Sequence, residues 1–339
     1  MSYENTVILS EAKNLIRMMG EELEMKKQDS EGVELKAGKK KRAKLTKGQI
    51  TLLAMTIPSM IFILLFAYLP MSGWIYSFFD YRIGYKLANT QFVGLENFRY
   101  AFGNRDLLNV IYNTFTISIM GLLGLPIAGA MAILLSEVRF KKFRRIVQTA
   151  ITIPNFISWI IIYSLMFSLF SMDGVVTILF RNVFGDNGGT TLLSNPDTAK
   201  LFMVATNIWK TAGYSSIIFF AAITGIDSEL FDAAAVDGAG RWRKISYITI
   251  PGLMPTFVTL LIIAIGALLN NGFEQYYVFT NPMIQKNIEV LDYYVYRIGM
   301  MNNDIPASTA VSMVKTAFSV ILVFGVNKIS KKALGQSII

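Results

Sequence analysis

The stretch at residues 227–255 reads DSELFDAAAVDGAGRWRKISYITIPGLMP. Asp227 is a residue type that caps helix N-termini, and the Ala-rich segment after it is helix-forming. Gly238 then predicts a stop, because glycine tolerates the left-handed conformation in which many helices end. The stretch therefore predicts a short helix with a small-residue face, followed by a turn and a second helix that leads into Pro251.

Long apolar runs lie on both sides of this stretch and recur along the chain. Four runs contain no charged residue, and two more are each broken by one lysine, Lys210 or Lys315. The uncharged runs are residues 48–79, 107–136, 146–172 and 245–273, and the interrupted runs are residues 201–226 and 305–327. Because about 20 apolar residues cross a hydrocarbon core, we predict an all-α polytopic membrane protein with six transmembrane helices.

The composition agrees with a membrane protein and excludes several kinds of chemistry. Of the 339 residues, 53% are hydrophobic and 16% are charged, whereas an average soluble domain is about 25% charged. The chain has neither His nor Cys, which excludes a thiolate nucleophile, an imidazole base, and zinc or haem sites with their usual ligands. We predict no catalytic residue and no metal site in this chain.

The basic residues predict the orientation in the membrane. With the N-terminus placed in the cytoplasm, 22 of the 32 Lys and Arg fall in inside segments and 8 in outside segments. Lys and Arg next to membrane spans are retained on the cytoplasmic side, so both termini are predicted to be cytoplasmic. The net charge of +9 is thereby explained without a nucleic-acid partner.

The predicted domains follow from these runs. Residues 1–47 form a cytoplasmic N-terminal extension, residues 48–330 form the transmembrane domain with the loop 227–251, and residues 331–339 form a cytoplasmic tail. Within the extension, apolar residues at helical spacing favour an amphipathic helix over residues 4–27, which would lie on the membrane or on a cytosolic partner. A disordered tail is the alternative. The basic linker KKKRAKLTK follows at residues 39–47.

The loop resembles the cytoplasmic signature of permease subunits of binding-protein-dependent ATP-binding-cassette importers. In that signature a Glu-Ala-Ala triplet is followed by Gly six positions after the acid, Ile ten positions later and Pro three further on. The matching residues here are Asp232, Ala233, Ala234, Asp237, Gly238, Ala239, Ile248 and Pro251, with Asp232 where glutamate is usual. The resemblance implies a type I importer permease fold. It also implies that the short helix is a coupling helix, which docks on an ATPase subunit and transmits its closure.

Other segments resemble the carbohydrate permeases of this family, and the resemblance covers roughly residues 45–335. They are FVGLENF at residues 92–98, the pair Asn113-Thr114, NGFEQYYVFTNPM at residues 271–283 and VLDYYVYRIGM at residues 290–300. The last two are most similar to permeases for complex oligosaccharides and polysaccharides. The resemblance therefore implies a multi-pass protein of the bacterial cell membrane that carries such a sugar.

Aligned position in this family suggests a sugar-binding set on the helices before and after the loop. The candidates are Asn207, Trp209, Lys210, Thr211, Tyr214, Asn270, Asn271, Glu274, Gln275 and Tyr276. Aromatic faces cover the CH surfaces of sugars, and amides bond to their hydroxyl groups. For each residue alone, helix packing or a place in the interfacial aromatic belt is the alternative.

The two lysines within spans each need a partner, because a lysine at mid-membrane costs about 2.5–3.5 kcal/mol on insertion scales. We expect Lys210 either to pair with Glu274 or to bind an acidic sugar such as a uronate. Lys315 would contact a second permease.

The resemblance implies a set of partners and no cofactor in this chain. One six-helix subunit forms half of a translocation path, so a second, homologous permease is expected, together with two ATPase subunits that bind ATP and Mg²⁺ and an external sugar-binding protein. A secondary transporter would show inverted repeats, and a membrane enzyme for lipid-linked sugars would need clustered carboxylates. Neither feature is apparent, so a transport subunit is preferred.

Overall fold

The computed structural model describes residues 47–184 and 192–334. Over these ranges the chain is helical, with a single isolated bridge between Phe79 and Phe92 as its β-pairing, which confirms the all-α prediction. The predicted helix at residues 4–27 lies outside the described residues. Contacts divide the chain into two units, Met1–Met71 and Ser72–Ile339. The domain boundaries predicted at residues 47 and 330 stay predictions.

The described part of the first unit is a long apolar helical run. Helix α2 (Lys47–Ile63) includes Pro58 and continues through the π-helical turn η1 (Leu64–Tyr68) into η2 (Leu69–Phe78). This run contains the candidate span Thr51–Phe78, whose most apolar window has no buried residue. Such a surface is stable only against lipid or another protein, because its burial from water is what stabilises it.

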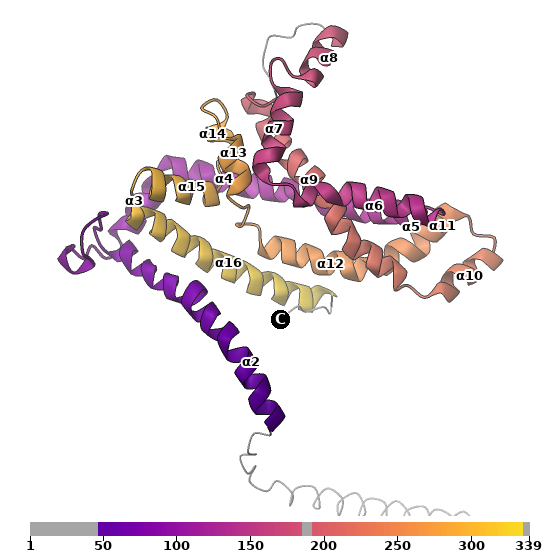
Figure 1. Cartoon of the computed structure of the whole chain (residues 1–339), viewed down its shortest axis with the longest axis horizontal. Coiled ribbons are helices and arrows are strands. Elements are labelled where there is room, and N and C mark those ends of the chain that lie inside the picture. The colour runs from indigo at the N-terminus through magenta and orange to yellow at the C-terminus, as the bar shows by residue number, and fades with distance from the viewer. Residues whose placement is uncertain (1–46, 185–191, 335–339) are drawn as a thin grey trace, which may run out of the picture. The chain divides into compact units, whose positions relative to one another are not determined.

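The second unit is organised around α9 (Pro196–Thr224), a helix of 29 residues that packs against five other helices. Its neighbours are α4 (Arg105–Gly121), α5 (Gly124–Ser136), α6 (Lys141–Phe156), α12 (Ile250–Gly266) and the short helix α14 (Gln285–Ile288). Asn195 caps the N-terminus of α9 by accepting a hydrogen bond from the Asp197 N–H at 2.9 Å. In Figure 1, α5, α6 and α12 extend toward the end of the unit that carries α10 and α11, while α3 (Glu96–Gly103) lies at the opposite end.

The run at residues 146–172, predicted as one span, is broken. Helix α6 ends at Phe156, and α7 (Trp159–Phe170) begins after Ile157 and Ser158, both in extended conformation. Pro154 lies two residues before the end of α6, and the Ser158 side chain caps α7 at the Ile161 N–H. A proline in the last turn of one helix and a serine that caps the next favour two helices over a continuous one. Helix α8 (Val175–Phe184) follows α7.

The remaining elements complete the loop and the C-terminal part. They are η3 (Leu87–Asn89), α10 (Ser228–Val236), α11 (Arg241–Lys244), η4 (Ile245–Thr249), α13 (Glu274–Phe279), α14 (Gln285–Ile288), α15 (Leu291–Tyr296), η5 (Arg297–Met301) and α16 (Ile305–Leu334). Helix α16 packs on α12, α3 and α15.

Five helical runs of the described residues are long and apolar enough to cross a membrane. They are Thr51–Phe78, Arg105–Ser136, Trp159–Val183, Arg241–Gly266 and Ile305–Lys328. Helix α9 is not among them, although 29 residues extend about 43 Å at 1.5 Å per residue. The predicted count of six and the cytoplasmic placement of both termini therefore stay predictions.

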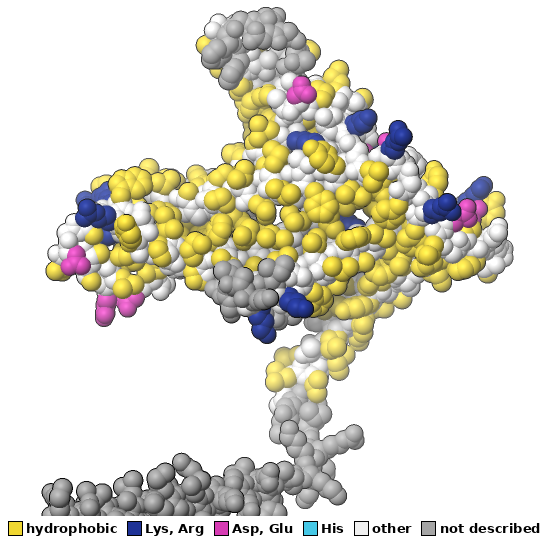
Figure 2. All heavy atoms as spheres, turned by 180° about the vertical axis from the view of Figure 1, so that it is seen from behind, with side chains coloured by type: hydrophobic (Ala, Val, Ile, Leu, Met, Phe, Trp, Pro, Cys, Tyr) yellow, Lys and Arg dark blue, Asp and Glu magenta, His cyan; other side chains and the backbone are white. Residues whose placement is uncertain are grey.

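The surface agrees with a lipid environment. In each of these five windows, no more than 22% of the residues are buried. Figure 2 shows hydrophobic side chains covering most of one face, with Lys, Arg, Asp and Glu mainly toward its margins. Apolar side chains on the outside and charges near the ends are what a hydrocarbon core requires.

Candidate functional site

A cavity of about 340 Å³ lies between α4, α5, α9 and the segment that follows α12. Its walls are mostly small or aliphatic, and no charged side chain lines it. Its polar lining consists of amides and hydroxyls. These residues are Ser118, Asn207, Thr211, Ser215, Asn270, Asn271 and Tyr276. A neutral lining that can both donate and accept hydrogen bonds suits a polyhydroxylated ligand.

The polar groups of the cavity hold each other in place. Asn207 Nδ2 donates to Gln275 Oε1 at 3.3 Å, which connects α9 to α13. The Ser118 hydroxyl lies 2.7 Å from Asn271 Oδ1, which connects α4 to the segment after α12. The Thr211 hydroxyl donates to the Asn207 carbonyl at 2.8 Å, so its oxygen lone pairs can still accept. The site is therefore fixed by contacts among three separate parts of the chain.

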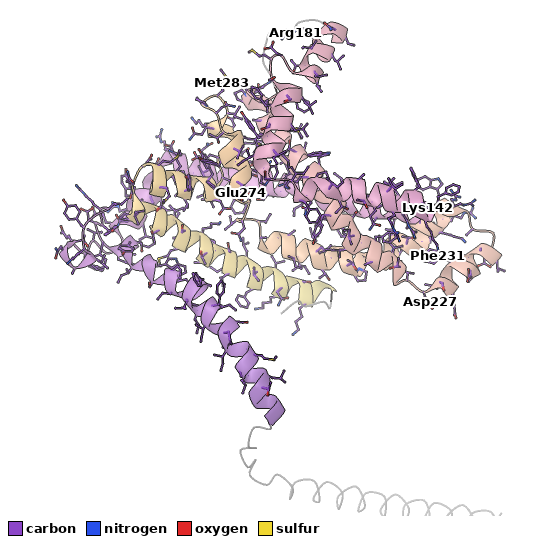
Figure 3. The ribbon with its side chains drawn as sticks, in the orientation of Figure 1. Lys142, Arg181, Asp227, Phe231, Glu274 and Met283 are labelled. Atoms are coloured by element: carbon purple, nitrogen blue, oxygen red, sulfur yellow. The ribbon has the colours of Figure 1, made fainter. Side chains whose placement is uncertain are left out.

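Half of the predicted sugar-binding set meets in this cavity. The five that line it are Asn207, Thr211, Asn270, Asn271 and Tyr276. Three others lie on exposed surface, namely Trp209, Tyr214 and Glu274. The last two, Lys210 and Gln275, are buried in helix packing. Figure 3 shows Glu274 at the start of α13. A sugar-binding role for these ten residues stays a prediction, and the geometry now favours the first five.

Sequence reasoning missed the contribution of α4. Thr114, Ser118 and Gly121 recur at spacings of four and three residues, so they share one face of the helix. Ser118 and Gly121 both line the cavity, and Gly124 follows at the start of α5. A polar and small-residue stripe at helical spacing within an apolar run was the signal that could have identified this wall.

Lys210 does not form the predicted ion pair with Glu274. Its ammonium donates instead to three backbone carbonyls at the end of α6, those of Pro154 at 3.1 Å, Asn155 at 2.9 Å and Ile157 at 2.5 Å. The side chain is buried. The carbonyls at a helix C-terminus lack intrahelical partners and carry the negative end of the helix dipole, so they satisfy a lysine that lies beside them.

Lys315 is paired within its own chain, and its contact with a second permease stays a prediction. Its ammonium forms an ion pair with Asp292 Oδ1, and Asp292 Oδ2 accepts the Gly272 N–H at 3.0 Å. Gly272 has a φ of +80°, a conformation that glycine adopts readily. The pair thus connects α16 to the segment that carries Asn271.

We expect this pair to position the edge of the cavity. Lys315→Met should destabilise the protein by about 3–5 kcal/mol, because it leaves a partly buried carboxylate without its partner. The exchanged variant, Lys315→Asp with Asp292→Lys, should regain part of the lost stability. Thermal unfolding of the purified protein measures both. A double variant no more stable than either single variant would contradict an interaction between the two side chains.

The segment between α12 and α16 is fastened to α4 by the pair Asn113-Thr114. Asn113 Nδ2 donates to the Glu289 carbonyl at 3.2 Å, and the Thr114 hydroxyl accepts the Leu291 N–H at 3.0 Å. Arg297 donates to both carboxylate oxygens of Glu289, at 2.5 and 3.1 Å. Burial raises the pKa of the Glu289 carboxyl, although the hydrogen bonds and charge of Arg297 oppose the shift. These contacts give the Asn-Thr pair a structural role.

Helix α10 has the ends that its sequence predicted. The Asp227 carboxylate accepts the Glu229 N–H at 2.9 Å. At the other end, the Ala239 N–H donates to the Ala234 carbonyl at 2.8 Å, the Gly238 N–H donates to the Ala235 carbonyl at 3.1 Å, and Gly238 has a φ of +73°. This pattern is a Schellman motif, in which a left-handed glycine ends the helix.

Six of the eight predicted ATPase-coupling residues lie on or just after this exposed helix, whereas Ile248 lies in η4 and Pro251 at the start of α12. No residue of α10 is buried. Figure 3 shows Asp227, the residue before α10, and Phe231 of α10 at one end of the unit, away from Glu274. Lys244 Nζ donates to the Phe231 carbonyl at 3.0 Å, which holds α11 against α10. The helix is thus presented as a small, braced projection, and the contact of its residues with an ATPase stays a prediction.

The chain matches a known family over most of its described length. Residues 124–336 match the model of the binding-protein-dependent transport system inner membrane component. The match contains the cavity-lining part of α9 and the whole of α10.

Curated relatives extend the similarity beyond these residues. The chain is 37% identical over 278 residues to Protein LplB of Bacillus subtilis (strain 168), a match that covers 81% of this chain and 87% of the relative. It is also 37% identical over 279 residues to the polygalacturonan/rhamnogalacturonan transport system permease protein YteP of the same organism, covering 82% and 87%.

A solved structure has the same fold. It is a chain of a bacterial alginate ABC transporter in complex with an alginate pentasaccharide-bound periplasmic protein, with a TM-score of 0.78 and 31% sequence identity. The similarity covers 86% of this chain and 98% of that chain.

Proposed function

Because the chain belongs to the family of inner membrane components of binding-protein-dependent transport systems, we propose that it forms half of the translocation path for an oligosaccharide or polysaccharide. It is a multi-pass permease of the bacterial cell membrane and not an enzyme. A permease of this kind needs a place for the sugar, a contact for the motor, and partners that supply the other half of the path and the energy.

The cavity is the observation that carries the proposal. Its volume of about 340 Å³ accommodates part of a glycan chain, and its lining offers amides and hydroxyls without a charged side chain. Tyr276 also lines the cavity, with 3% of its surface exposed, so it forms part of the packed wall. Similarity to the permease YteP and to the alginate transporter supports a polymeric sugar as cargo.

The motor contact is the exposed helix α10. It follows α9 after only three residues, Gly225, Ile226 and Asp227, so a push on α10 acts directly on the helix that carries Asn207 and Thr211. We assign Asp232 and Gly238 to a groove of an ATPase subunit. Movement of packed helices as rigid bodies is a known route for such a signal.

In the proposed complex, this chain works with four other protein subunits and the transported sugar. A second permease, homologous to this chain but different, completes the path, and two cytoplasmic ATPase subunits bind the ATP and Mg²⁺. An external protein delivers the sugar, as the periplasmic protein is bound in the similar alginate transporter. The conformational cycle begins when the loaded binding protein docks outside, and ATP-driven closure then brings the two coupling helices together.

Purification from native membranes tests the composition of the complex. A tagged copy of this chain should bring down a second permease and an ATPase in stoichiometric amounts. The sugar carried is then identified by screening neutral and acidic oligosaccharides for binding to the external protein and for uptake. Recovery of the chain without either subunit, from membranes that take up the sugar, would contradict the proposal.

Removing one cavity hydroxyl should weaken transport. Thr211→Val keeps the side-chain volume and removes a group that can bond to a sugar hydroxyl. A single hydrogen bond contributes about 0.5–1.5 kcal/mol, so uptake at limiting sugar should fall by roughly 2- to 13-fold. The matched control is Thr224→Val on the same helix, whose hydroxyl also bonds to a backbone carbonyl but lies outside the cavity. Equal uptake by the two variants would count against the cavity.

A further inference from the structure

The break between α6 and α7 leaves backbone carbonyls that need hydrogen-bond donors, and the side chain of Lys210 supplies them. Carbonyls at the end of a helix lack most of their intrahelical partners, and burial keeps water from replacing them. Lys210 of α9 lies beside three carbonyls at this break, those of Pro154 and Asn155 at 3.1 and 2.9 Å and that of Ile157, the residue after α6, at 2.5 Å. The Pro154 carbonyl also accepts the Ile157 N–H at 3.2 Å. An ammonium has three N–H donors, so this arrangement engages all of them.

The same lysine also contacts the first residue of α7. Its Nζ lies 5.3 Å from the centre of the Trp159 ring, within the range of a cation–π interaction. Lys210 therefore touches the end of one helix and the start of the next from a third helix. Its exposed fraction is 8%, which excludes most of the competing water that would weaken these contacts.

A second close contact lies one turn further along α9. A Cβ atom at Gly213 would stand 1.9 Å from the Ile151 carbonyl oxygen, so the backbones of α9 and α6 are in direct contact there. Gly213 brings the two helices together, and Lys210 fastens the end of α6 to them. Asn207, three residues before Lys210 on the helix, and Thr211, the next residue, line the cavity.

We propose that Lys210 is a positioning residue that joins α9 to the α6–α7 break, so that movement of α10 reaches α7 together with the cavity. The proposal rests on the function proposed above. Helix α10 pushes on α9, and the same turns of α9 carry both the cavity residues Asn207 and Thr211 and the contacts of Lys210 with the α6–α7 break. We call the contacts of Lys210 with the end of α6 and the start of α7 the Lys210 joint. Without this joint, α9 moves but α7 does not move with it, and less sugar is transported for each ATP hydrolysed. Lys210 acts through the backbone of α6 and need not touch the sugar.

The test uses the complete transporter in proteoliposomes with its binding protein, second permease and ATPases. Lys210→Met keeps the length of the side chain and removes its donors, and Lys210→Arg restores charge and donors. We expect Lys210→Met to assemble and to retain basal ATPase activity, while the sugar transported per ATP falls at least tenfold. Lys210→Arg should recover most of that ratio. Lys200→Met is the matched control, because Lys200 lies on the same helix over the Tyr112 ring at 4.5 Å.

The ratio of sugar to ATP separates a joint from a merely structural lysine. If uptake and ATPase activity fall together in Lys210→Met and the ratio is unchanged, the proposal is overturned. An unchanged ratio with full activity overturns it as well. If Lys210→Met does not assemble, Lys210→Gln replaces it, since an amide still satisfies part of the carbonyl set, and the same ratio decides.

Measuring the distance between the ends of α7 and α9 distinguishes a failure of this proposal from a failure of the proposed function. The chain has no cysteine, so spin labels can be attached to cysteines introduced at Ser171, after α7, and at Thr224, at the end of α9. In the parent, ATP should shift a single narrow distance, and in Lys210→Met the distribution should be broad. If the parent complex moves no sugar, the proposed function fails, while identical distributions in parent and variant overturn the joint.

Discussion

Replacing Gly213 with alanine should prevent this protein from assembling. The added Cβ would lie 1.9 Å from the Ile151 carbonyl oxygen and 2.5 Å from its carbon, and both are backbone atoms that no side-chain rotation can move away. Helices α6 and α9 would have to separate. Overpacking of a tight contact costs about 1–3 kcal/mol and sometimes more, and separation here would also strain the bonds of Lys210 to the end of α6. We expect little folded protein in detergent and no uptake.

The control for this prediction is Gly129→Ala in α5. Gly129 is also a buried glycine within a helix, but a Cβ there meets no atom within 4 Å. Alanine should be tolerated or slightly stabilising at this position, since it favours the helix more than glycine does. Yield, size-exclusion profile and thermal unfolding compare the two variants. Equal behaviour would show that the close approach of α9 to Ile151 is not required.

Replacing Gly238 with valine should weaken the contact with the ATPase subunit while leaving the membrane helices stable. At a φ of +73°, a β-branched residue is strongly disfavoured, by about 1–2 kcal/mol or more. The Schellman bonds that end α10 would be lost, and the helix end that carries Asp237 would change direction. Because no residue of α10 is buried, thermal unfolding should change little. Uptake should fall at least tenfold, with less ATPase recovered in the purified complex.

Two controls separate backbone conformation from side-chain size. Gly238→Asn should retain most of the uptake, because asparagine tolerates the left-handed region. Gly240→Val introduces the same side chain two residues later, where φ is −70° and a Cβ meets no atom within 4 Å. It should be close to the parent unless an ATPase covers this position. Full uptake and full ATPase recovery in Gly238→Val would refute the proposed coupling role.

The features that sequence predicted well are governed by neighbours along the chain. The Asp227 cap and the Gly238 stop depend on bonds between residues two to five positions apart. Five of the six predicted apolar runs contain or overlap a candidate span, because length and hydropathy are properties of the segment itself. The family signature in residues 232–251 belongs to the same class of local information. None of these inferences required knowledge of which helix packs on which.

The features that sequence could not predict depend on helix packing. Lys210 was expected either to pair with Glu274, the nearest acidic residue in the predicted topology, or to bind an acidic sugar. The three carbonyls that it contacts became visible only once α6 was seen to end at Phe156 beside α9. Lys315 was likewise expected to face another protein and is paired with Asp292.

By itself, the sequence determined that this protein is helical, that it lies in a membrane and that it presents a capped helix carrying a transporter signature. Tertiary structure alone decided which five of the ten candidate residues share a cavity, and which lysine fastens a broken helix. The physical reason is the distance along the chain over which the stabilising contacts act. Caps and apolar runs are stabilised by contacts within a few residues, whereas the cavity and the Lys210 joint bring together groups more than 50 positions apart.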